Sequence, residues 1–141
     1  MKNIDLMKLV EEKLKVRNRY NLEIGFFETA KYPNGAYVAT IAKYQEYGTI
    51  NIPARPFFRN AINSKYQAWL NVYGGSLKNN DSYKLTLSKT GEAARNDIVK
   101  SITSINEPPL KQSTIKAKGS SNPLIDTGLL RRSVSYKVVS K

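Results

Sequence analysis

The sequence predicts an α+β fold, in which a small antiparallel sheet of about three or four strands packs against two or three helices. Apolar and polar residues alternate at 22–26 and at 134–138, as in half-buried strands. Apolar residues recur every three or four positions over 58–73 and 87–105, as in amphipathic helices. We expect the last strand to pair with one of the first two. Residues 1–141 would then form a single domain, since both ends complete one sheet.

The first quarter of the chain is predicted to contain a helix, a strand and a tight turn. Helical spacing of apolar residues predicts the helix over about 4–19, and the strand at 22–26 follows it. The PNG step at 33–35 predicts the turn, because Asn and Gly accept the positive φ of hairpin turns. The segment 37–47 fits both a returning strand and a short helix ending at Gly48. We favour a strand followed by a helical turn.

The first of two long central helices is predicted over 58–73, from an aromatic and aliphatic stripe at helical spacing. Two consecutive glycines at 74–75 are expected to stop it, as Gly commonly does at a helix C-terminus. We expect Phe57, Phe58 and Trp69 to lie in the core rather than at an interface.

The second long helix is predicted to begin after Asp81 or Ser82, either of which can act as its N-cap. Gly91 interrupts the apolar stripe, so a kink or break is expected near Thr90. The two prolines at 108–109 end the helical region. The inward stripe of this helix consists of Leu87, Ala94, Ile98, Ile102 and Ile105.

A long loop is predicted in the C-terminal half of the chain. Residues 110–121 are polar and cationic, with one helical turn expected at 113–118. Loops of this length in small domains are commonly functional. Asp126 or Thr127 can then cap a short helical turn through Leu130, just before the last strand.

The composition excludes several kinds of chemistry. Because the sequence has no Cys and no His, metal–thiolate sites and Ser-His or Cys-His nucleophiles are excluded. The 11 acidic residues are scattered among 23 Lys and Arg, and no pair of carboxylates stands out. We therefore expect no enzymatic activity, no catalytic residue, no cofactor and no metal site.

The sequence also gives an expectation about where the protein is made. Its N-terminus has charges every few residues and no apolar segment of signal-peptide length. There is no run of about 18 apolar residues, so no membrane partner is expected. These features favour a protein made in a cytoplasm.

The net charge of +12 makes a nucleic-acid partner worth considering. The cations are spread along the chain, although after Glu107 only Asp126 opposes seven of them. No zinc finger, Gly-rich KH-type loop or RNP-like aromatic string is present. Two interpretations stay open. The cations form a solvated basic surface, or they contact a polyanion through its phosphates, independently of base sequence.

Two stretches combine Pro or Gly with an apolar residue and one ionisable group. The first is EYGT at 46–49 followed by IPARPFF at 52–58, and the second is PLIDTGL at 123–129. Such residues fix loops in a defined shape against a core. Shaped loops without reactive groups are typical of proteins that act as parts of an assembly.

The candidate interface residues lie in or near these stretches. Glu46 is predicted either to pair with Arg55 across the loop or to contact a neighbouring subunit. The cations of the 110–122 loop are the strongest interface candidates, and the two arginines before the last strand are either surface charges or partner contacts. The complete candidate set is Glu46, Arg55, Lys111, Lys116, Lys118, Arg131 and Arg132.

From about residue 20 to the end, the order of motifs resembles the neck and tail-completion proteins of tailed bacteriophages, which are also called minor tail or virion morphogenesis proteins. The resemblance depends on the order rather than on any single motif. After an early strand pair, the motifs are residues 38–42, EYGT at 46–49, IPARPF at 52–57, the Trp69 helix, PPL at 108–110, STIKAK at 113–118, PLIDTGL at 123–129 and SVSY at 133–136.

The resemblance implies a structural function in the virion. It implies a homo-oligomeric ring, with a hexamer as the candidate size, at the junction between the DNA-filled head and the tail. The implied partners are head-completion or connector proteins on one side and tail terminator or tail tube proteins on the other. Non-specific contact with genomic DNA is compatible with it. Non-specific nucleic-acid binding without such a ring is the alternative function.

Overall fold

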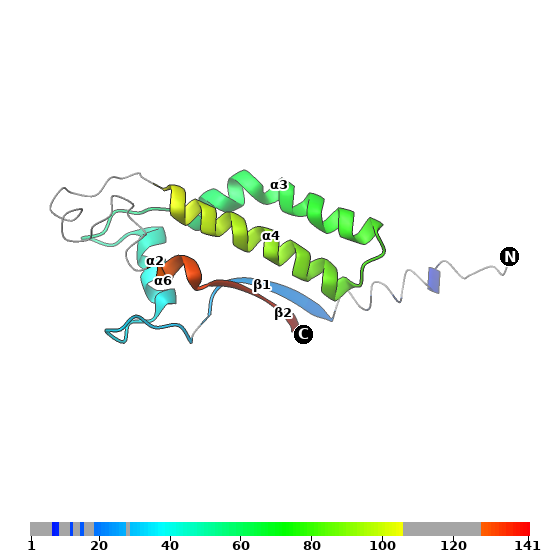
Figure 1. Ribbon diagram of the computed structural model, residues 1–141, viewed down its shortest axis with the longest axis horizontal. Helices are drawn as coiled ribbons and strands as arrows, with labels where there is room; N and C mark the ends of the chain where they lie inside the picture. Colours follow the sequence, from blue (N-terminus) through cyan, green and yellow to red (C-terminus); the bar gives the residue numbers. More distant parts are fainter. Residues whose placement is uncertain (1–6, 9–11, 13–14, 16–18, 28, 106–127) are drawn as a thin grey trace.

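The computed structural model describes residues 7–8, 12, 15, 19–27, 29–105 and 128–141. Figure 1 shows α3 as the outer layer, α4 in the middle and the two strands beneath α4, with α2 and α6 at one end. No helix in the described ranges is long and apolar enough to cross a membrane. The elements in chain order are β1 (Tyr20–Phe26), α2 (Val38–Tyr47), α3 (Phe57–Lys78), α4 (Tyr83–Ser104), α6 (Leu129–Arg132) and β2 (Val134–Ser140).

The described residues contain one antiparallel sheet of two strands. Its register pairs Tyr20 with Ser140 at one end and Phe26 with Val134 at the other. The α+β class and the pairing of the last strand with the first are therefore confirmed. The prediction of about three or four strands is wrong, because the sheet of the described residues stops at two.

The missing third strand is the segment expected after the turn at 33–35. The turn itself is confirmed, with Gly35 at φ +87°. The returning strand is reduced to a single bridge between Lys31 and Tyr37, and α2 begins at the next residue. The segment 38–47 forms a helix rather than a strand because its buried residues are spaced four apart, and this spacing puts them on one helical face. These side chains are Val38, Ala42 and Glu46.

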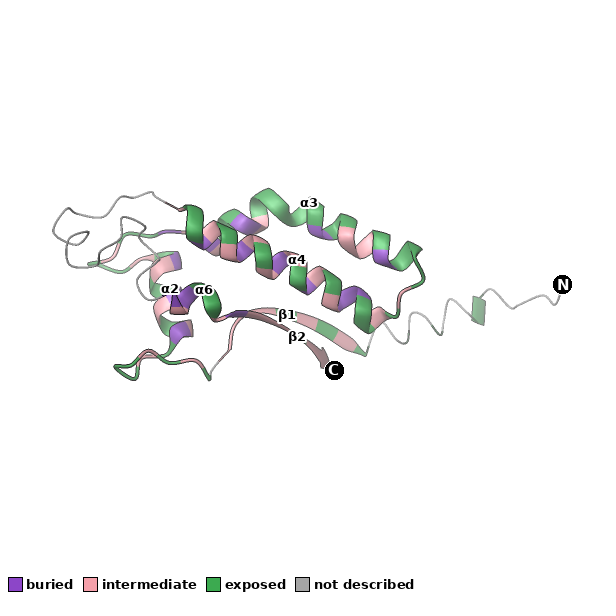
Figure 2. Cartoon of the chain, viewed as in Figure 1, coloured by how far each residue is buried: buried purple, intermediate pink, exposed green. Residues whose placement is uncertain are grey.

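Helix α4 lies at the centre of the hydrophobic core. It packs against α3 on one side and against β1 and β2 on the other. Its Ala94, Ile98 and Ile102 are at most 1% exposed, which confirms the predicted inward stripe at these positions. Figure 2 shows the buried positions of α4 along its length. Other elements complete the core with Val38, Ala42, Phe57, Ala61, Leu130 and Val134.

The aromatic residues expected in the core are found there. Phe57 is 1% exposed, and its ring meets that of Phe26 edge-on at a centroid distance of 6.0 Å. Phe58 is partly buried against the core. Trp69 is buried between α3 and α4, where its indole N–H donates to Asp97 Oδ2 at 2.8 Å. This hydrogen bond satisfies the one polar group of the indole.

The expected stop of α3 at 74–75 is wrong, since the helix continues to Lys78. A glycine ends a helix when it takes a positive φ, and neither of these two glycines does. The chain instead turns at Asn80, which has φ +57°. Ser82 is the N-cap of α4, as predicted, and its hydroxyl accepts a hydrogen bond from the Leu85 N–H at 3.2 Å.

The side chain of Asp81 stabilises the turn between α3 and α4. Its carboxylate accepts hydrogen bonds from Lys89 on α4 and from the Ser76 hydroxyl on α3, the latter at 2.6 Å. The hydrogen bond from Lys89, followed by that from Ser76, holds the pKa of Asp81 below its ordinary value. A lowered folded-state pKa means that the ionised carboxylate stabilises the turn above about pH 4. This contribution is lost as the pH falls through the folded-state pKa.

Gly91 allows the sheet to approach α4 closely, and it does not break the helix. The helix runs from Tyr83 to Ser104 without interruption, so the expected break near Thr90 is wrong. A Cβ atom at Gly91 would lie 2.6 Å from the Tyr136 ring and 2.8 Å from Leu22 Cδ1. The glycine is therefore needed for packing between layers.

Several sequence predictions fall outside the described residues. Most of the helix predicted over 4–19 lies there, although the described positions 7, 8, 12 and 15 are helical. The loop predicted at 110–121, its turn at 113–118 and the two candidate caps at 126 and 127 lie outside as well. Helix α6 starts after Gly128, which has φ +77°, and its Leu130 is buried.

We predict that Gly91→Ala lowers the free energy of unfolding by about 1–3 kcal/mol, because the new methyl group overpacks the contact with Tyr136 and Leu22. Gly75→Ala is the matched control, since a Cβ there meets nothing within 4 Å. In a helix interior this control should gain up to about 1 kcal/mol. Urea unfolding of both variants checks the prediction, and a stabilising Gly91→Ala would contradict it.

Candidate assembly interface

The carboxylate of Glu46 on α2 binds the first turn of α3. Glu46 is 6% exposed. Its oxygens accept hydrogen bonds from the backbone N–H groups of Phe58 at 2.9 Å and Arg59 at 3.1 Å. The Arg59 side chain adds an ion pair at 2.9 Å and a hydrogen bond to the Glu46 backbone carbonyl. The N-cap of α3 is Pro56, which offers no side-chain acceptor, so Glu46 caps this helix from another element.

The connector, residues 48–56 between α2 and α3, has a fixed backbone. Gly48 has φ +75°, and a Cβ there would lie 2.8 Å from Ala54 N. The Thr49 N–H donates to the Ile52 carbonyl at 2.8 Å, and the Arg55 N–H donates to the carbonyl of Gln45 at 2.7 Å. Close approach at Gly48 and these two hydrogen bonds hold the connector against the end of α2.

The predicted pairing of Glu46 with Arg55 is wrong, because the partner of Glu46 is Arg59. Arg55 is buried, and this burial lowers its pKa from the ordinary value. Arg59 is not among the residues predicted from the sequence. The signal in the sequence was Pro56, since a helix that starts after proline needs an acceptor from elsewhere for its first N–H groups.

The connector presents an apolar side chain to solvent. Ile50 at its tip is fully exposed. Tyr44 and Tyr47 on the preceding helix are 42% and 63% exposed. The Tyr47 ring lies 4.9 Å from the Arg59 guanidinium, which links it to the Glu46 cluster. An exposed aliphatic residue on a fixed backbone is suited to docking, since little conformational entropy is lost on binding.

The structure places part of the predicted candidate set at one end of the molecule. Arg131 and Arg132 are exposed on α6, which packs beside α2 (Figure 1). Glu46 lies within the same group of elements, but buried and structural. Lys111, Lys116 and Lys118 lie outside the described residues.

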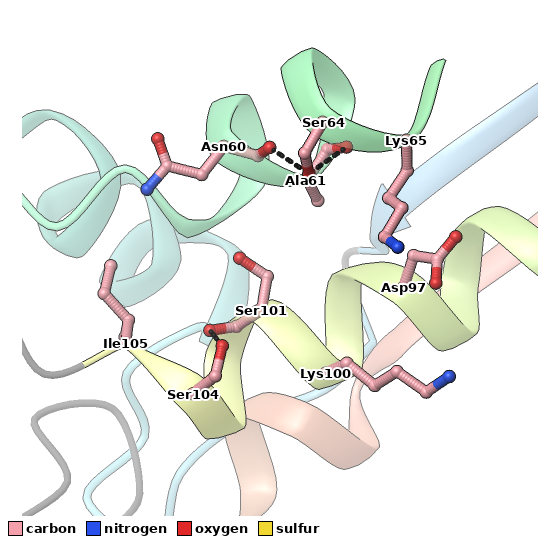
Figure 3. A pocket seen from close by; sticks show the side chains of 9 residues that line it. All are labelled: Asn60, Ala61, Ser64, Lys65, Asp97, Lys100, Ser101, Ser104 and Ile105. Carbon is pink, nitrogen blue, oxygen red and sulfur yellow. Dashed lines mark hydrogen bonds between the residues drawn. The ribbon is translucent and has the colours of Figure 1, made fainter. Parts of the chain in front are cut away.

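An open groove of about 360 Å³ lies between α3 and α4 (Figure 3). Lys65 and Lys100 line it, together with hydroxyl groups of Ser64 and Ser101. Its one carboxylate, Asp97, is engaged by the Trp69 indole. No group of three or more His, Cys, Asp or Glu within the described ranges could hold a metal ion.

Comparison with known proteins assigns no class to this chain. No family model, no curated protein and no solved structure matches it. Its function has to be inferred from its own residues, and the connector is the feature whose geometry is most specific.

We predict that Glu46→Gln lowers the free energy of unfolding by about 1–3 kcal/mol, because the neutral amide loses the charge-assisted hydrogen bonds to the start of α3. Glu92→Gln is the control, since Glu92 is exposed and its contact with Arg95 spans 3.8 Å. The control should change the free energy of unfolding by less than about 0.5 kcal/mol. Chemical unfolding at neutral pH distinguishes the two variants, and equal effects would refute the capping role.

Proposed function

We propose that this chain is a structural component of a bacteriophage virion, a tail-completion or neck protein that joins the tail to the DNA-filled head as one subunit of a ring. The observation that carries the proposal is the connector. Two of the motifs on which the family resemblance depends, EYGT at 46–49 and IPARPF at 52–57, make up the connector and the residues next to it. The contacts of Glu46 with the start of α3 hold these residues in place. The motifs therefore build a loop of fixed shape, and this supports a docking role.

Under this proposal, exposed apolar and cationic side chains contact the partners. Copies of the chain form the ring, for which a hexamer is the candidate size. Ile50 and Tyr47 provide apolar contact for a neighbouring layer, formed either by head-completion or connector proteins or by tail terminator or tail tube proteins. The exposed Arg131 and Arg132 and the overall charge of +12 suit sequence-independent contact with DNA in the channel. The protein would be assembled in the bacterial cytoplasm and remain at the head–tail junction.

The test is deletion of the gene from the phage or prophage that carries it. Lysates should then contain DNA-filled heads and separate tails by electron microscopy, and the chain supplied in trans should restore joined particles. Mass spectrometry should detect the chain in purified wild-type virions. Normal yields of complete virions without the chain would refute the proposal.

We further predict that Ile50→Ser lowers the yield of joined particles about tenfold or more in this complementation assay, because loss of an apolar anchor at the centre of an interface costs about 2 kcal/mol and about 1.4 kcal/mol already corresponds to a tenfold change. Its thermal stability should match that of the wild type, since Ile50 is fully exposed. Tyr66→Ser, at an exposed position of α3, is the matched control and should complement normally. Full complementation by Ile50→Ser would exclude the connector tip as a docking element.

Non-specific nucleic-acid binding is the second candidate, and the charge of +12 is the observation that favours it. It would be supported by tight binding of duplex DNA by the isolated monomer, with affinity falling steeply as salt increases. Dispensability in virion assembly together with such binding would put this candidate first.

A further inference from the structure

In the described part of the chain, each strand of the two-stranded sheet has one edge that no other strand covers. Within the described residues β1 pairs only with β2, and the Lys141 N–H donates to the Arg19 carbonyl at 2.8 Å. In an antiparallel ladder this bond makes Arg19 and Lys141 a hydrogen-bonded pair. Hydrogen-bonded pairs alternate along the ladder with pairs whose backbone N–H and C=O groups point outward. The backbone groups of Leu22, Ile24, Tyr136 and Val138 therefore point away from the partner strand.

A contact from α4 supports this assignment. The Val134 carbonyl, which belongs to the same alternating set, accepts a hydrogen bond from Arg95 Nε at 3.1 Å. This carbonyl therefore points away from β1, as the register requires. Beyond it, the described part of the chain shows no backbone hydrogen bond to the outward groups of Tyr136 and Val138. Unpaired strand edges of this kind are templates for a further strand.

Each strand carries one charged residue, and the two lie directly opposite each other. Glu23 of β1 faces Lys137 of β2 in the register. Their neighbours Leu22 and Tyr136 point to Gly91 of α4, so Glu23 and Lys137 lie on the opposite face. Both are exposed, and no ion pair joins them in the described structure. The Lys137 ammonium lies over the Phe27 ring at 4.0 Å.

We propose that the edge of β1 pairs with the edge of β2 in a second copy of this chain, antiparallel and in the same register as within the chain. This register is possible because residues of β1 whose backbone N–H and C=O groups point outward then lie opposite residues of β2, in the second copy, whose backbone groups also point outward. It brings Glu23 of one copy opposite Lys137 of the next. Pairing β1 with β1 would instead oppose two carboxylates, and pairing β2 with β2 would oppose two ammonium groups, both of which are unfavourable.

The charges therefore select head-to-tail association. Such contacts generate a ring when the rotation between copies closes and a filament when it does not. The inference deepens the proposed function, on which its biological role rests, by naming the surfaces that neighbouring subunits of the ring would share. Edge pairing itself requires only copies of this chain, so the purified protein is sufficient to test it.

Two opposite charge reversals test the proposal. Glu23→Lys and Lys137→Glu each place like charges at every interface of their own copies. We expect sedimentation velocity of the full chain to show concentration-dependent association of the wild type, about tenfold weaker for either variant alone. An equimolar mixture of the variants should recover the association, because each mixed interface again joins opposite charges.

The mixture also separates edge pairing from damage to the fold. Each variant keeps its own like-charged pair across β1 and β2 within the chain, so recovery on mixing cannot come from repair of the monomer. Glu92→Lys makes the same charge change as Glu23→Lys on α4 and should associate as the wild type does.

Several outcomes would overturn edge pairing. They are a wild type that stays monomeric at all concentrations, undiminished association of Glu23→Lys, and no gain on mixing. A monomeric chain that is nevertheless required for joining heads to tails would refute edge pairing alone. A chain that associates as predicted but is dispensable for virion assembly would refute the proposed function alone.

Discussion

The carboxylate of Glu46 at the start of α3 is the constraint on which the end of the molecule that carries the connector depends. A buried carboxylate is tolerated only when donors replace its water, and here all three donors come from the first turn of α3. The contact fixes α2 against α3, and so fixes both ends of the connector. Because α3 packs on α4, the position of Ile50 is tied to the core through rigid elements.

Helix α4 has to be apolar on two sides, since α3 covers one and the sheet covers the other. A two-stranded sheet is marginal alone, so β1 and β2 depend on this helix for burial. Gly91 brings the strands close, at the expense of helix propensity. The arrangement stabilises the inner face of the sheet, but neither outer edge is paired by another described strand, and this leaves the edges available to a strand of a second molecule.

The sequence predicted those features that depend on local periodicity. These are the two strands, the two long helices and the Ser82 cap. It failed where distant residues decide. From the sequence, Gly91 is interpreted as a helix breaker, because its contact with Tyr136 is not visible there. Arg55 is interpreted as the partner of Glu46, because the sequence does not show that the start of α3 lies beside Glu46. The exposure of Ile50 has no signal in the sequence, because Ile is usually buried.

The two proposed surfaces lie on different parts of the molecule. The connector is at the end formed by α2 and α6, whereas β1 and β2 run beneath α4 (Figure 1). Edge pairing would use backbone groups along the strands and leave Ile50 accessible. A subunit could therefore contact like neighbours through its sheet and an unlike layer through its connector. A ring between two different assemblies needs this separation, because a single surface could not serve both kinds of partner at once.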